Sequence, residues 1–445
     1  MPERYDAVIV GLGESGYACA RYLAAQGRRI AITDSRAQPP RLADTQNRLP
    51  DVPLILGGFD AELLQRADEI IVSPGVDRRE SPLAEAAASG TPVCGEIELF
   101  ARAARAPVVV VTGSNGKSTV TTLVGEMAAA AGLDAAVGGN LGTPALDLLR
   151  SPEPEIYVLE LSSFQLETVT SLNAAAAVVL NISPDHLDRY ATLDAYASAK
   201  RRAFRGDGVM VVNRDDPAVA AMAEAKRTVL TFGLGEPGNE AAFGIITMDG
   251  QRWLARGDRR IVAADDLPVA GDHNLANALA ALALAAAGGI PEAPAVAALR
   301  EFRGLPHRME FIRETGGVAY FNDSKGTNVG ATVAAVNGLQ TPVVLIAGGQ
   351  GKGQDFSALA DALRGRARGV VLMGEDAPAL AEALGDAVPV SRAVDMEDAV
   401  RRAAALASPG DAVVLSPACA SFDMFAGYEA RGEAFRHAVE GLGHG

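Results

Sequence analysis

The sequence predicts an α/β protein with three domains, each built on a mostly parallel sheet. The length of 445 residues fits about three domains of ~150 residues each. Short apolar runs alternate with alanine-rich stretches along nearly the whole chain, as strands alternate with helices in α/β proteins. Two of the apolar runs lead directly into a glycine-rich turn and then into a helical stretch.

The composition is that of a globular protein, with 49% hydrophobic and 21% charged residues. A net charge of −15 argues against nucleic-acid and membrane-surface partners, because both are anionic. Cys19, Cys94 and Cys419 lack metal-ligand spacing and are expected to be buried thiols. The amino terminus has no signal-peptide core, and no apolar run nears the ~18 residues that span a bilayer. These features predict a cytoplasmic protein.

The first domain is expected over residues 1–95. Val8–Val10 and Ile30–Ile32 are predicted strands, with a helix over Ser15–Gln26 between them, and Glu69–Val72 is a later strand. This order of strand, helix and strand favours a parallel sheet with the helix packed on one face.

Gly11-Leu12-Gly13-Glu14-Ser15-Gly16 joins the first strand to the first helix, and Asp34 follows at the end of the second strand. This is the G-x-G-x-x-G pattern of Rossmann-like domains, in which glycines let the backbone approach a diphosphate at a helix N-terminus. The pattern indicates a nucleotide diphosphate but leaves its identity open. A nicotinamide or flavin cofactor is the usual occupant.

The central domain is expected over residues 96–304. Its first strand, Pro107–Val111, leads into a second glycine-rich turn and a helix over Ser118–Ala131. Later elements are strands at Ile156–Leu161 and Ala177–Ile182, a hairpin excursion at Gly233–Asp258 and a helix at Asn274–Ala287. The third domain, residues 305–445, has predicted strands at Val343–Ala347, Gly369–Met373 and Ala412–Leu415.

The second turn is a phosphate loop that predicts an ATP site. Its residues are Gly113, Ser114, Asn115, Gly116, Lys117, Ser118 and Thr119. Lys117 is expected to neutralise the β- and γ-phosphates, and the hydroxyl of Ser118 or Thr119 to reach Mg²⁺. The match departs from G-x-x-x-x-G-K-[ST] because Val111 stands where the first glycine belongs.

Glu160 and His186 follow two neighbouring strands of the central domain and are candidates for holding a metal. Lys200 follows on the next helical stretch. A bare ammonium beside Mg²⁺ would be repelled, so either Lys200 points to solvent or its charge is chemically altered. Two phosphate sites in one chain indicate a nucleotide-linked substrate as well as ATP.

A set of motifs spread over the chain resembles the Mur ligase family. They are Thr-Gly-Ser-Asn-Gly-Lys-Ser-Thr (112–119), Gly-Gly-Asn-Leu-Gly (138–142), Glu-Leu-Ser-Ser-Phe-Gln-Leu (160–166), Asp-His-Leu-Asp-Arg-Tyr (185–190), Gly-Asp-His-Asn-Leu-Ala-Asn-Ala (271–278), Gly-Leu-Pro-His-Arg-Met-Glu (304–310), Asn-Asp-Ser-Lys-Gly-Thr-Asn (322–328) and Leu-Ser-Pro-Ala-Cys-Ala-Ser-Phe-Asp (415–423). The resemblance covers essentially the whole length in the family's order.

The resemblance implies a Rossmann-like N-terminal domain, a P-loop ATPase-like central domain and a Rossmann-like C-terminal domain. It implies an ATP-dependent ligase that adds D-glutamate to UDP-N-acetylmuramoyl-L-alanine through an acyl phosphate, in peptidoglycan precursor synthesis. A monomer with two Mg²⁺ ions is expected, and Lys200 matches a lysine that the family carries as a carbamate.

The resemblance also assigns site residues by position. Those for the UDP substrate are Ser15, Asp34, Ser35, Arg36, Gly75, Asn140 and Gln165, and those for ATP beyond the loop are Asn274, Asn277, Arg308 and Asp323. Those for D-glutamate are Thr327, Lys352, Ser421 and Phe422, with Lys325 as a further candidate. Ser118, Glu160, His186 and carbamylated Lys200 are the metal set, and Lys117, Glu160, His186, Lys200 and Asn140 the catalytic set.

Three other interpretations stay open. The chain could be another amino-acid ligase of the family, including the folate-type polyglutamate ligases. It could be a redox enzyme that binds NAD(P) at the first glycine motif and turns over no ATP. A non-catalytic nucleotide-sensing protein is the third, and it is expected to have lost Lys117, Glu160 or His186, all of which are present.

Overall fold

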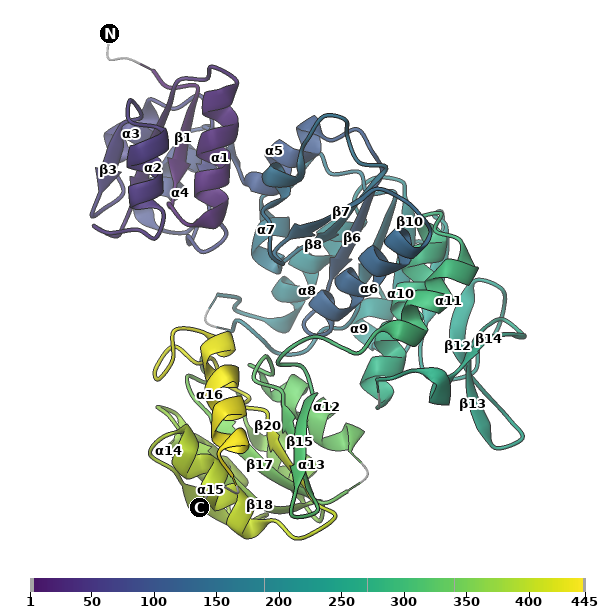
Figure 1. The fold of residues 1–445 in the computed structure, drawn as a ribbon. Helices are drawn as coiled ribbons and strands as arrows, with labels where there is room; N and C mark the ends of the chain where they lie inside the picture. Colours follow the sequence, from purple (N-terminus) through teal and green to yellow (C-terminus); the bar gives the residue numbers. More distant parts are fainter. Residues whose placement is uncertain (1–3, 188, 270, 340, 443–445) are drawn as a thin grey trace. The chain divides into compact units, whose positions relative to one another are not determined.

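The computed structural model describes residues 4–187, 189–269, 271–339 and 341–442, and its strands form three sheets (Figure 1). Its contacts divide the chain into two compact units. The first unit holds residues 1–181, 194–262 and 278–299, and the second holds residues 182–193, 263–277 and 300–445.

The first sheet has five strands in the order β3-β2-β1-β4-β5, all parallel. Its elements are β1 (Ala7–Val10), α1 (Glu14–Ala25), β2 (Ile30–Asp34), α2 (Leu42–Arg48), β3 (Leu54–Leu56), α3 (Ala61–Gln65), β4 (Ile70–Val72), α4 (Ser81–Ala88) and β5 (Val93–Cys94). The strand order reverses at β1, which pairs with β2 on one side and β4 on the other. The carboxyl end of β1 is therefore where an open α/β sheet forms a ligand crevice.

The second sheet has nine strands in the order β14-β13-β12-β11-β10-β9-β6-β8-β7. Its strands are β6 (Val108–Thr112), β7 (Ala135–Gly139), β8 (Ile156–Glu160), β9 (Ala176–Val179), β10 (Val209–Asn213), β11 (Val229–Phe232), β12 (Ala242–Met248), β13 (Gln251–Arg256) and β14 (Arg259–Ala263). Between β6 and β12 each described pairing is parallel, and β12 and β13 form the antiparallel hairpin expected from the polar, glycine-rich stretch.

Helices connect and cover this second sheet. They are α5 (Glu96–Ala103), α6 (Lys117–Ala130), η1 (Ala145–Leu148), α7 (Ser163–Glu167), α8 (Leu193–Arg201), η2 (Arg202–Phe204), α9 (Pro217–Ala220), η3 (Ala264–Asp266), α10 (Asp272–Ala287) and α11 (Glu292–Glu301). β6 lies between β8 and β9, and its residues are fully buried, as its run of four valines predicts.

The third sheet has six strands in the order β15-β16-β20-β17-β18-β19, with β15 antiparallel to β16 and the other pairs parallel. Its elements are β15 (Glu310–Thr315), β16 (Val318–Asn322), α12 (Val329–Gly338), β17 (Val343–Gly348), α13 (Ser357–Leu363), β18 (Ala367–Met373), α14 (Ala377–Leu384), β19 (Val390–Arg392), α15 (Met396–Leu406), β20 (Ala412–Leu415) and α16 (Tyr428–Glu440). Apolar side chains cover both faces of this sheet, one cluster against α12 to α14 and one against α15 and α16.

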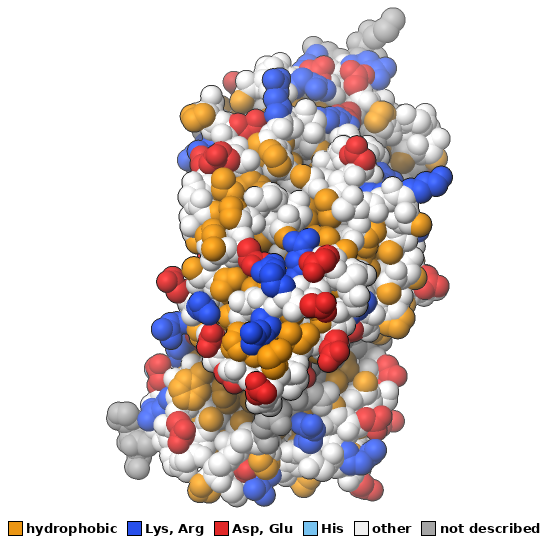
Figure 2. All heavy atoms as spheres, turned by 90° about the vertical axis from the view of Figure 1, so that its right-hand side faces the viewer, with side chains coloured by type: hydrophobic (Ala, Val, Ile, Leu, Met, Phe, Trp, Pro, Cys, Tyr) orange, Lys and Arg blue, Asp and Glu red, His pale blue; other side chains and the backbone are white. Residues whose placement is uncertain are grey.

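The predicted fold class is confirmed, because each domain is built on a mostly parallel sheet with helices between its strands. All three cysteines are free and buried, as expected. None of the described helices is long and apolar enough to cross a membrane. On the face drawn in Figure 2, basic, acidic and hydrophobic side chains are interspersed.

Candidate active site

A cavity of about 500 Å³ opens at the carboxyl ends of β1, β2 and β4, where the first sheet reverses its order. All five first-domain residues predicted to bind the nucleotide line it, namely Ser15, Asp34, Ser35, Arg36 and Gly75. Phe59, Ser73 and Glu80 also line it and were not predicted. They follow β3 and β4 along the chain, and the position of each after a strand is the only sequence signal that could have pointed to them.

The glycine turn of this cavity is closed by backbone contacts. Gly11 has φ +93°, and a Cβ atom at Gly16 would lie 1.9 Å from the carbonyl oxygen of Gly11. The Ser73 hydroxyl donates to the same carbonyl at 2.8 Å, which ties the end of β4 to the turn. Only glycine fits at position 16, so the motif glycines here serve the close packing of turn and helix.

Asp34 is the buried carboxylate of this cavity. Its Oδ2 accepts the backbone N–H of Leu12 at 2.6 Å, and its Oδ1 accepts the backbone N–H of Arg36 at 2.8 Å. The Arg36 guanidinium pairs with both oxygens. Burial opposes ionisation, but the hydrogen bonds from Arg36 and Leu12 outweigh it and hold the pKa of Asp34 below its usual value. The cavity therefore carries a fixed negative charge with a partly exposed guanidinium at its rim.

The phosphate loop joins β6 to α6. Gly116, with φ +82°, is the N-cap residue of α6, and Gly113 approaches Leu180 so closely that a Cβ would lie 2.9 Å from the Leu180 side chain. Asn181 clamps the loop, because its Oδ1 accepts the N–H of Asn115 at 2.8 Å and its Nδ2 donates to the Asn115 carbonyl at 3.1 Å. Asn181 was not predicted as a site residue, since only the fold brings it to the loop.

Two lysines converge on one carbonyl of this loop. The Lys117 ammonium donates to the carbonyl oxygens of Gly113 at 3.0 Å and Ser114 at 2.9 Å. The Lys200 ammonium, from α8, donates to the Gly113 carbonyl at 2.8 Å and lies 4.6 Å from the centroid of the Tyr196 ring. Lys200 is only 1% exposed, so its side chain does not point to solvent.

Glu160, the last residue of β8, is buried beside Asn140. Its Oε1 accepts the Asn140 side-chain amide at 2.6 Å, and its backbone carbonyl accepts the Asn140 N–H at 2.8 Å. Its other oxygen, Oε2, is buried and has no hydrogen-bond partner among the described residues. An unpartnered buried carboxylate oxygen is costly unless a cation or donor reaches it, and a carboxylate oxygen is a ligand that suits a hard cation such as Mg²⁺.

Gln165, predicted to contact the substrate, forms a capping box at the start of α7. Its side-chain Oε1 accepts the Ser162 N–H at 3.0 Å, and its own N–H donates to the Ser162 hydroxyl at 3.2 Å. That oxygen therefore has a structural partner already. The role of Gln165 toward substrate stays a prediction.

His186 belongs to the second unit, as does the rest of the segment 182–193. Its φ is +55°, and its backbone N–H donates to the Asp185 Oδ1 at 3.0 Å. The Asp185 Oδ2 accepts from the Asn328 side chain at 3.3 Å, which ties the segment to the start of α12. Asp188, within the same motif, lies outside the described residues. Within the described ranges, no group of three or more His, Cys, Asp or Glu side chains could hold a metal ion.

Asp323, which was predicted to bind ATP, is the first residue after β16. Its Oδ2 accepts the Ser416 hydroxyl at 2.6 Å, and its Oδ1 accepts the Met309 N–H at 3.3 Å. Burial raises the pKa of Asp323 to about 6, although the Ser416 hydrogen bond and the Arg308 charge act in the opposite direction. Arg308 is half-buried and lies in the turn that precedes β15.

Asn274 and Asn277, which were predicted to bind ATP, lie in the first turns of α10 and are half-buried. His273 precedes them and packs between two glycines, since Cβ atoms at Gly271 and Gly338 would each lie close to its ring, at 3.0 and 3.1 Å. Burial lowers the pKa of His273. The neutral ring therefore has a packing role within the second unit.

Arg431, from α16, organises the loops that carry the predicted D-glutamate residues. Only 2% exposed, it donates to the Ser324 hydroxyl at 3.0 Å, to the Ser324 carbonyl at 2.9 Å and to the Cys419 carbonyl at 3.1 Å. Further contacts reach the carbonyls of Ala420 and Gly348. One guanidinium thus joins the carboxyl ends of β16, β17 and β20, and no local motif around Arg431 predicted it.

The four predicted D-glutamate residues all follow these three strands. Ser421 is buried and Lys352 and Thr327 are half-buried, whereas Phe422 is 70% exposed. The aromatic ring beside Lys325 is that of Tyr428, whose centroid lies 3.5 Å from the Lys325 ammonium. Tyr428 also accepts the Ser324 hydroxyl through its carbonyl at 2.8 Å.

Positive φ angles at non-glycine residues gather in the same unit. Of the six such residues in the described part of the chain, five lie there, namely His186, His307, Met309, Lys352 and Ala418, while Asp249 occupies the β12–β13 turn. Backbone strain of this kind persists where the surrounding structure fixes it and is frequent at functional sites. These positions mark the loops of the second unit as candidates for a functional site.

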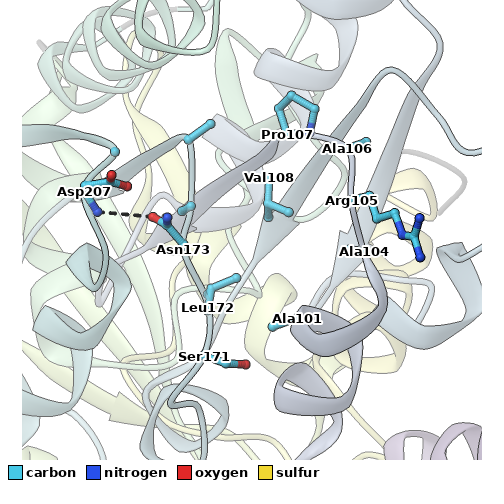
Figure 3. Close-up of a pocket in the computed structure, with 13 residues that line it drawn as sticks. Ala101, Ala104, Arg105, Ala106, Pro107, Val108, Ser171, Leu172, Asn173 and Asp207 are labelled. Atoms are coloured by element: carbon cyan, nitrogen blue, oxygen red, sulfur yellow. Dashed lines mark hydrogen bonds between the residues drawn. The ribbon is translucent and has the colours of Figure 1, made fainter.

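A second cavity, of about 390 Å³, lies at the opposite edge of the central sheet (Figure 3). It is lined from the amino ends of β6, β9 and β10, where the N–H of Asp207 donates to the Asn173 side chain at 3.2 Å. The phosphate loop follows the carboxyl end of β6, and no predicted site residue lines this cavity. It is separate from the candidate site.

Three family descriptions match successive parts of the chain. They are the Mur ligase MurD-like N-terminal domain over residues 5–95, the Mur ligase middle domain over residues 111–285 and the Mur ligase glutamate ligase domain over residues 307–419.

Full-length relatives share about half of the sequence. The UDP-N-acetylmuramoylalanine–D-glutamate ligase of Nitrosococcus oceani is 55% identical over 97% of this chain and 96% of its own length. The protein of the same name from Pseudomonas putida is 53% identical over 98% of this chain and 97% of its own length. Among solved structures, a pseudomurein peptide ligase type C from Methanothermus fervidus has the same fold, with a TM-score of 0.63 at 18% identity, covering 98% of this chain and 99% of that chain.

Proposed function

The chain belongs to the Mur ligase family, and on that premise we propose that it adds D-glutamate to UDP-N-acetylmuramoyl-L-alanine with ATP, in peptidoglycan precursor synthesis. One observation carries the choice of substrates. Relatives that cover nearly the whole chain at 53 to 55% identity have the name UDP-N-acetylmuramoylalanine–D-glutamate ligase. The reaction is an ATP-dependent amide-forming ligation.

The chemistry needs activation, because a carboxylate does not react with an amine at neutral pH. The γ-phosphoryl group of ATP passes to the alanine carboxylate, which gives an acyl phosphate and ADP. The amine of D-glutamate then attacks the acyl carbon, and phosphate leaves as the amide forms. The protein therefore has to hold three ligands, orient the alanine carboxylate and the D-glutamate amine, and offset the negative charge that develops during phosphoryl transfer.

Lys117 would offset charge on the transferring phosphoryl group. Its ammonium is already directed to the carbonyl oxygens of the phosphate loop, at the N-terminus of α6, where anions are favoured. The loop amides of Gly113 to Thr119 would bind the phosphates. Asn274, Asn277, Arg308 and Asp323 would contact the rest of ATP from the second unit.

Ser118, Glu160 and His186 would hold Mg²⁺, together with Lys200 as a carbamate. The unpartnered Oε2 of Glu160 supports this assignment, because a buried carboxylate oxygen without a donor suits a cation. When bound, Mg²⁺ supplies Lewis-acid stabilisation of the phosphate oxygens. Lys200 is buried beside the loop, and conversion of its ammonium to a carbamate would exchange a repelled cation for oxygen ligands. We propose two ions.

The first-domain cavity would hold the uridine diphosphate part of the substrate. The fixed carboxylate of Asp34 suits hydroxyl donors of a ribose, and the turn amides at the start of α1 suit a diphosphate. Asn140 and Gln165 would contact the muramoyl-alanine part. Thr327, Lys352, Ser421 and Phe422, with Lys325, would bind D-glutamate.

We propose domain boundaries at residues 95 and 304, so that residues 1–95 bind the UDP substrate, residues 96–304 bind ATP and residues 305–445 bind the amino acid. A monomer that works in the cytoplasm, without nucleic-acid or membrane partners, agrees with the net charge of −15. Size-exclusion chromatography with light scattering tests the monomer, and a dimer mass at micromolar concentration would contradict it.

Phosphate release measured with UDP-N-acetylmuramoyl-L-alanine and a panel of D- and L-amino acids tests the proposed function. We expect release with D-glutamate and background release with L-glutamate, with the other amino acids and with no amino acid. Equal turnover with L-glutamate on a folate substrate would instead support a polyglutamate ligase. NAD(P) binding without ATP turnover would support a redox enzyme.

A further inference from the structure

We propose that Gln354 is a positioning residue for the D-glutamate subsite. Its side chain joins three segments of the second unit. Each segment carries a residue that the proposed function assigns to D-glutamate, namely Thr327, Lys352 or Ser421. The role of Gln354 therefore rests on the proposed function. Gln354 itself contacts no ligand in this scheme and acts through the backbone of the three segments.

The Gln354 side chain is buried and uses both ends of its amide. The residue is only 9% exposed. Its Oε1 accepts the backbone N–H of Val329, at the start of α12, at 3.0 Å. Its Nε2 donates to the carbonyl oxygens of Gly351 at 3.0 Å and Ala418 at 3.4 Å. One amide thus joins the start of α12 to the loops that follow β17 and β20.

The bond to α12 holds the segment that carries Thr327. Val329 is the first residue of this helix, so its N–H has no partner within the helix. The Asn328 side chain caps a later N–H, that of Ala331, at 2.8 Å, and Gln354 accepts the N–H of Val329. Thr327 lies two residues before Val329, so this bond fixes the backbone beside it.

The bond to Gly351 closes a tight turn that presents Lys352. The backbone N–H of Gln354 donates to the Gly351 carbonyl at 3.1 Å, and the side-chain Nε2 donates to the same oxygen. The two residues between them, Lys352 and Gly353, have φ of +53° and +71°, both positive as at the centre of a type I′ turn. Such a backbone is uncommon for lysine and persists only where its surroundings hold it. Gln354 supplies two of the bonds that do so.

The bond to Ala418 reaches the loop that carries Ser421. Ala418 also has a positive φ, +58°. A backbone bridge between Gln350 and Ala420, with bonds of 3.0 and 2.9 Å, pairs this loop with the loop that follows β17. These two loops are thus joined by backbone atoms, and the Gln354 side chain attaches α12 to the pair.

D-glutamate has two carboxylates and an amine, and the amine has to reach the acyl carbon. A ligand held at several points loses affinity and alignment when those points shift, and a displacement of about 1 Å can cost about 100-fold. Without the Gln354 amide the three segments keep their own side chains but lose their common anchor. The effect is expected on D-glutamate, because ATP and the sugar nucleotide are assigned to other residues.

Gln350 provides a matched control on the same loop. Its side-chain Nε2 donates to Oε2 of Glu375 at 3.2 Å, in an exposed contact. Its bridge to Ala420 uses backbone atoms only. Gln350→Met therefore removes a glutamine amide from this loop and leaves the three side-chain bonds of Gln354 in place. Gln354→Met is the test variant, because methionine is similar in length to glutamine and has no amide.

The test is steady-state phosphate release by the full chain and by both variants, with each of the three substrates varied in turn. For Gln354→Met we expect the KM for D-glutamate to rise at least about tenfold, with a smaller change in kcat. The KM values for ATP and UDP-N-acetylmuramoyl-L-alanine should stay within about twofold. Gln350→Met should leave all three KM values within about twofold, as for other surface substitutions.

Three outcomes would overturn the positioning role. They are an unchanged KM for D-glutamate in Gln354→Met, an equal rise in all three KM values, and an equal effect of Gln350→Met on the KM for D-glutamate. If Gln354→Met does not fold, Gln354→Asn decides, because its amide stands on a side chain one methylene shorter. A rise confined to D-glutamate then supports the role, and no rise contradicts it. A wild-type chain that releases no phosphate in response to D-glutamate would refute the proposed function itself.

Discussion

The two glycine-rich loops of the first unit share one local design and differ in the charge placed beside it. Each joins a buried parallel strand to a helix, β1 to α1 and β6 to α6. Beside the first loop lies the carboxylate of Asp34, which accepts a backbone N–H of that loop. Beside the second lie the ammonium groups of Lys117 and Lys200, which donate to its carbonyl oxygens.

The difference teaches that a glycine-rich turn specifies a phosphate position, while the neighbouring side chain specifies the rest of the ligand. A carboxylate at the strand end repels a terminal phosphate and accepts hydroxyl donors, which suits an internal diphosphate with a ribose attached. Ammonium groups suit the charge of a terminal triphosphate. Substitutions at these residues should therefore affect the two proposed nucleotide sites separately.

The largest effect is expected for Lys117→Ala. Loss of the ammonium should remove several kcal/mol of transition-state stabilisation and lower kcat by about 10³-fold, as for other electrostatic contacts to a developing charge. Phosphate release at saturating ATP measures this, with the exposed Lys226→Ala as the control. UDP binding should not change. Near-normal turnover would mean that the second loop is not the ATP site.

A smaller loss of turnover is expected for Lys200→Ala. If the residue acts as a carbamate, turnover should fall by about 10² to 10³-fold, because a ligand of the proposed metal set is lost. Short-chain carboxylic acids should restore part of it by supplying the missing oxygens. Arg201→Ala, next along α8 and exposed, is the control and should stay active. Full activity of Lys200→Ala without added acid would leave Lys200 as a packing residue.

Asp34→Asn is expected to weaken UDP binding by about tenfold to a hundredfold. The substitution keeps the shape but removes the charge that hydrogen-bonds Leu12 and pairs with Arg36, and hydrogen bonds to charged groups contribute about 1.5–3 kcal/mol each. Calorimetry with UDP measures the change, and Asp44→Asn, an exposed partner of Arg41, serves as the control. The Kd for ATP should be unchanged. A parallel loss of ATP affinity would break the comparison between the loops.

The smallest effect is a difference in pH dependence between the two nucleotide sites. The pKa of Asp323 is raised to about 6 by burial, so this carboxylate is protonated below that pH and accepts ribose hydroxyls poorly. The KM for ATP should rise severalfold as the pH falls from 7 to 5. UDP affinity should stay flat, because the pKa of Asp34 is lowered.

Asp323→Asn is the control for that pH dependence and should remove it. The same variant also tests whether the pKa of Asp323 is raised rather than lowered. A buried carboxyl with a raised pKa destabilises the fold increasingly as the pH rises through about 6, so Asp323→Asn should raise the Tm more at pH 7 than at pH 5. A KM for ATP that stays constant between pH 5 and 7 in the wild type would contradict the assignment of Asp323.

The sequence predicted the residues that lie next to a strand end. Ser15, Asp34 and Gly75 belong to three different strand–loop junctions, yet they line one cavity because the carboxyl ends of β1, β2 and β4 meet at one edge. The glycine pattern marked Asp34, the family resemblance assigned Ser15 and Gly75, and the parallel-sheet rule explains why all three meet at one edge.

Residues that depend on distant partners could not be predicted in this way. Asn181 reaches the phosphate loop only because β9 pairs beside β6, and the Asn140 side chain is fixed by a carboxylate 20 positions away. Tyr428 lies beside Lys325 through the packing of α16, whereas Phe422, in the motif itself, is exposed. A sequence motif identifies the loop, and the packing of other elements determines which side chains of that loop face inward.

The Arg431 guanidinium also determines when, during synthesis, the loops that it joins can be completed. Arg431 and Ser324 are 107 positions apart, so β16 leaves the ribosome several seconds before α16 does, at about 5–20 residues per second. Until then the carbonyls at the ends of β16, β17 and β20 have no guanidinium to join them. During synthesis the two glycine-rich loops of the first unit can therefore form early, while the loops after β16, β17 and β20 are joined only when α16 has been made.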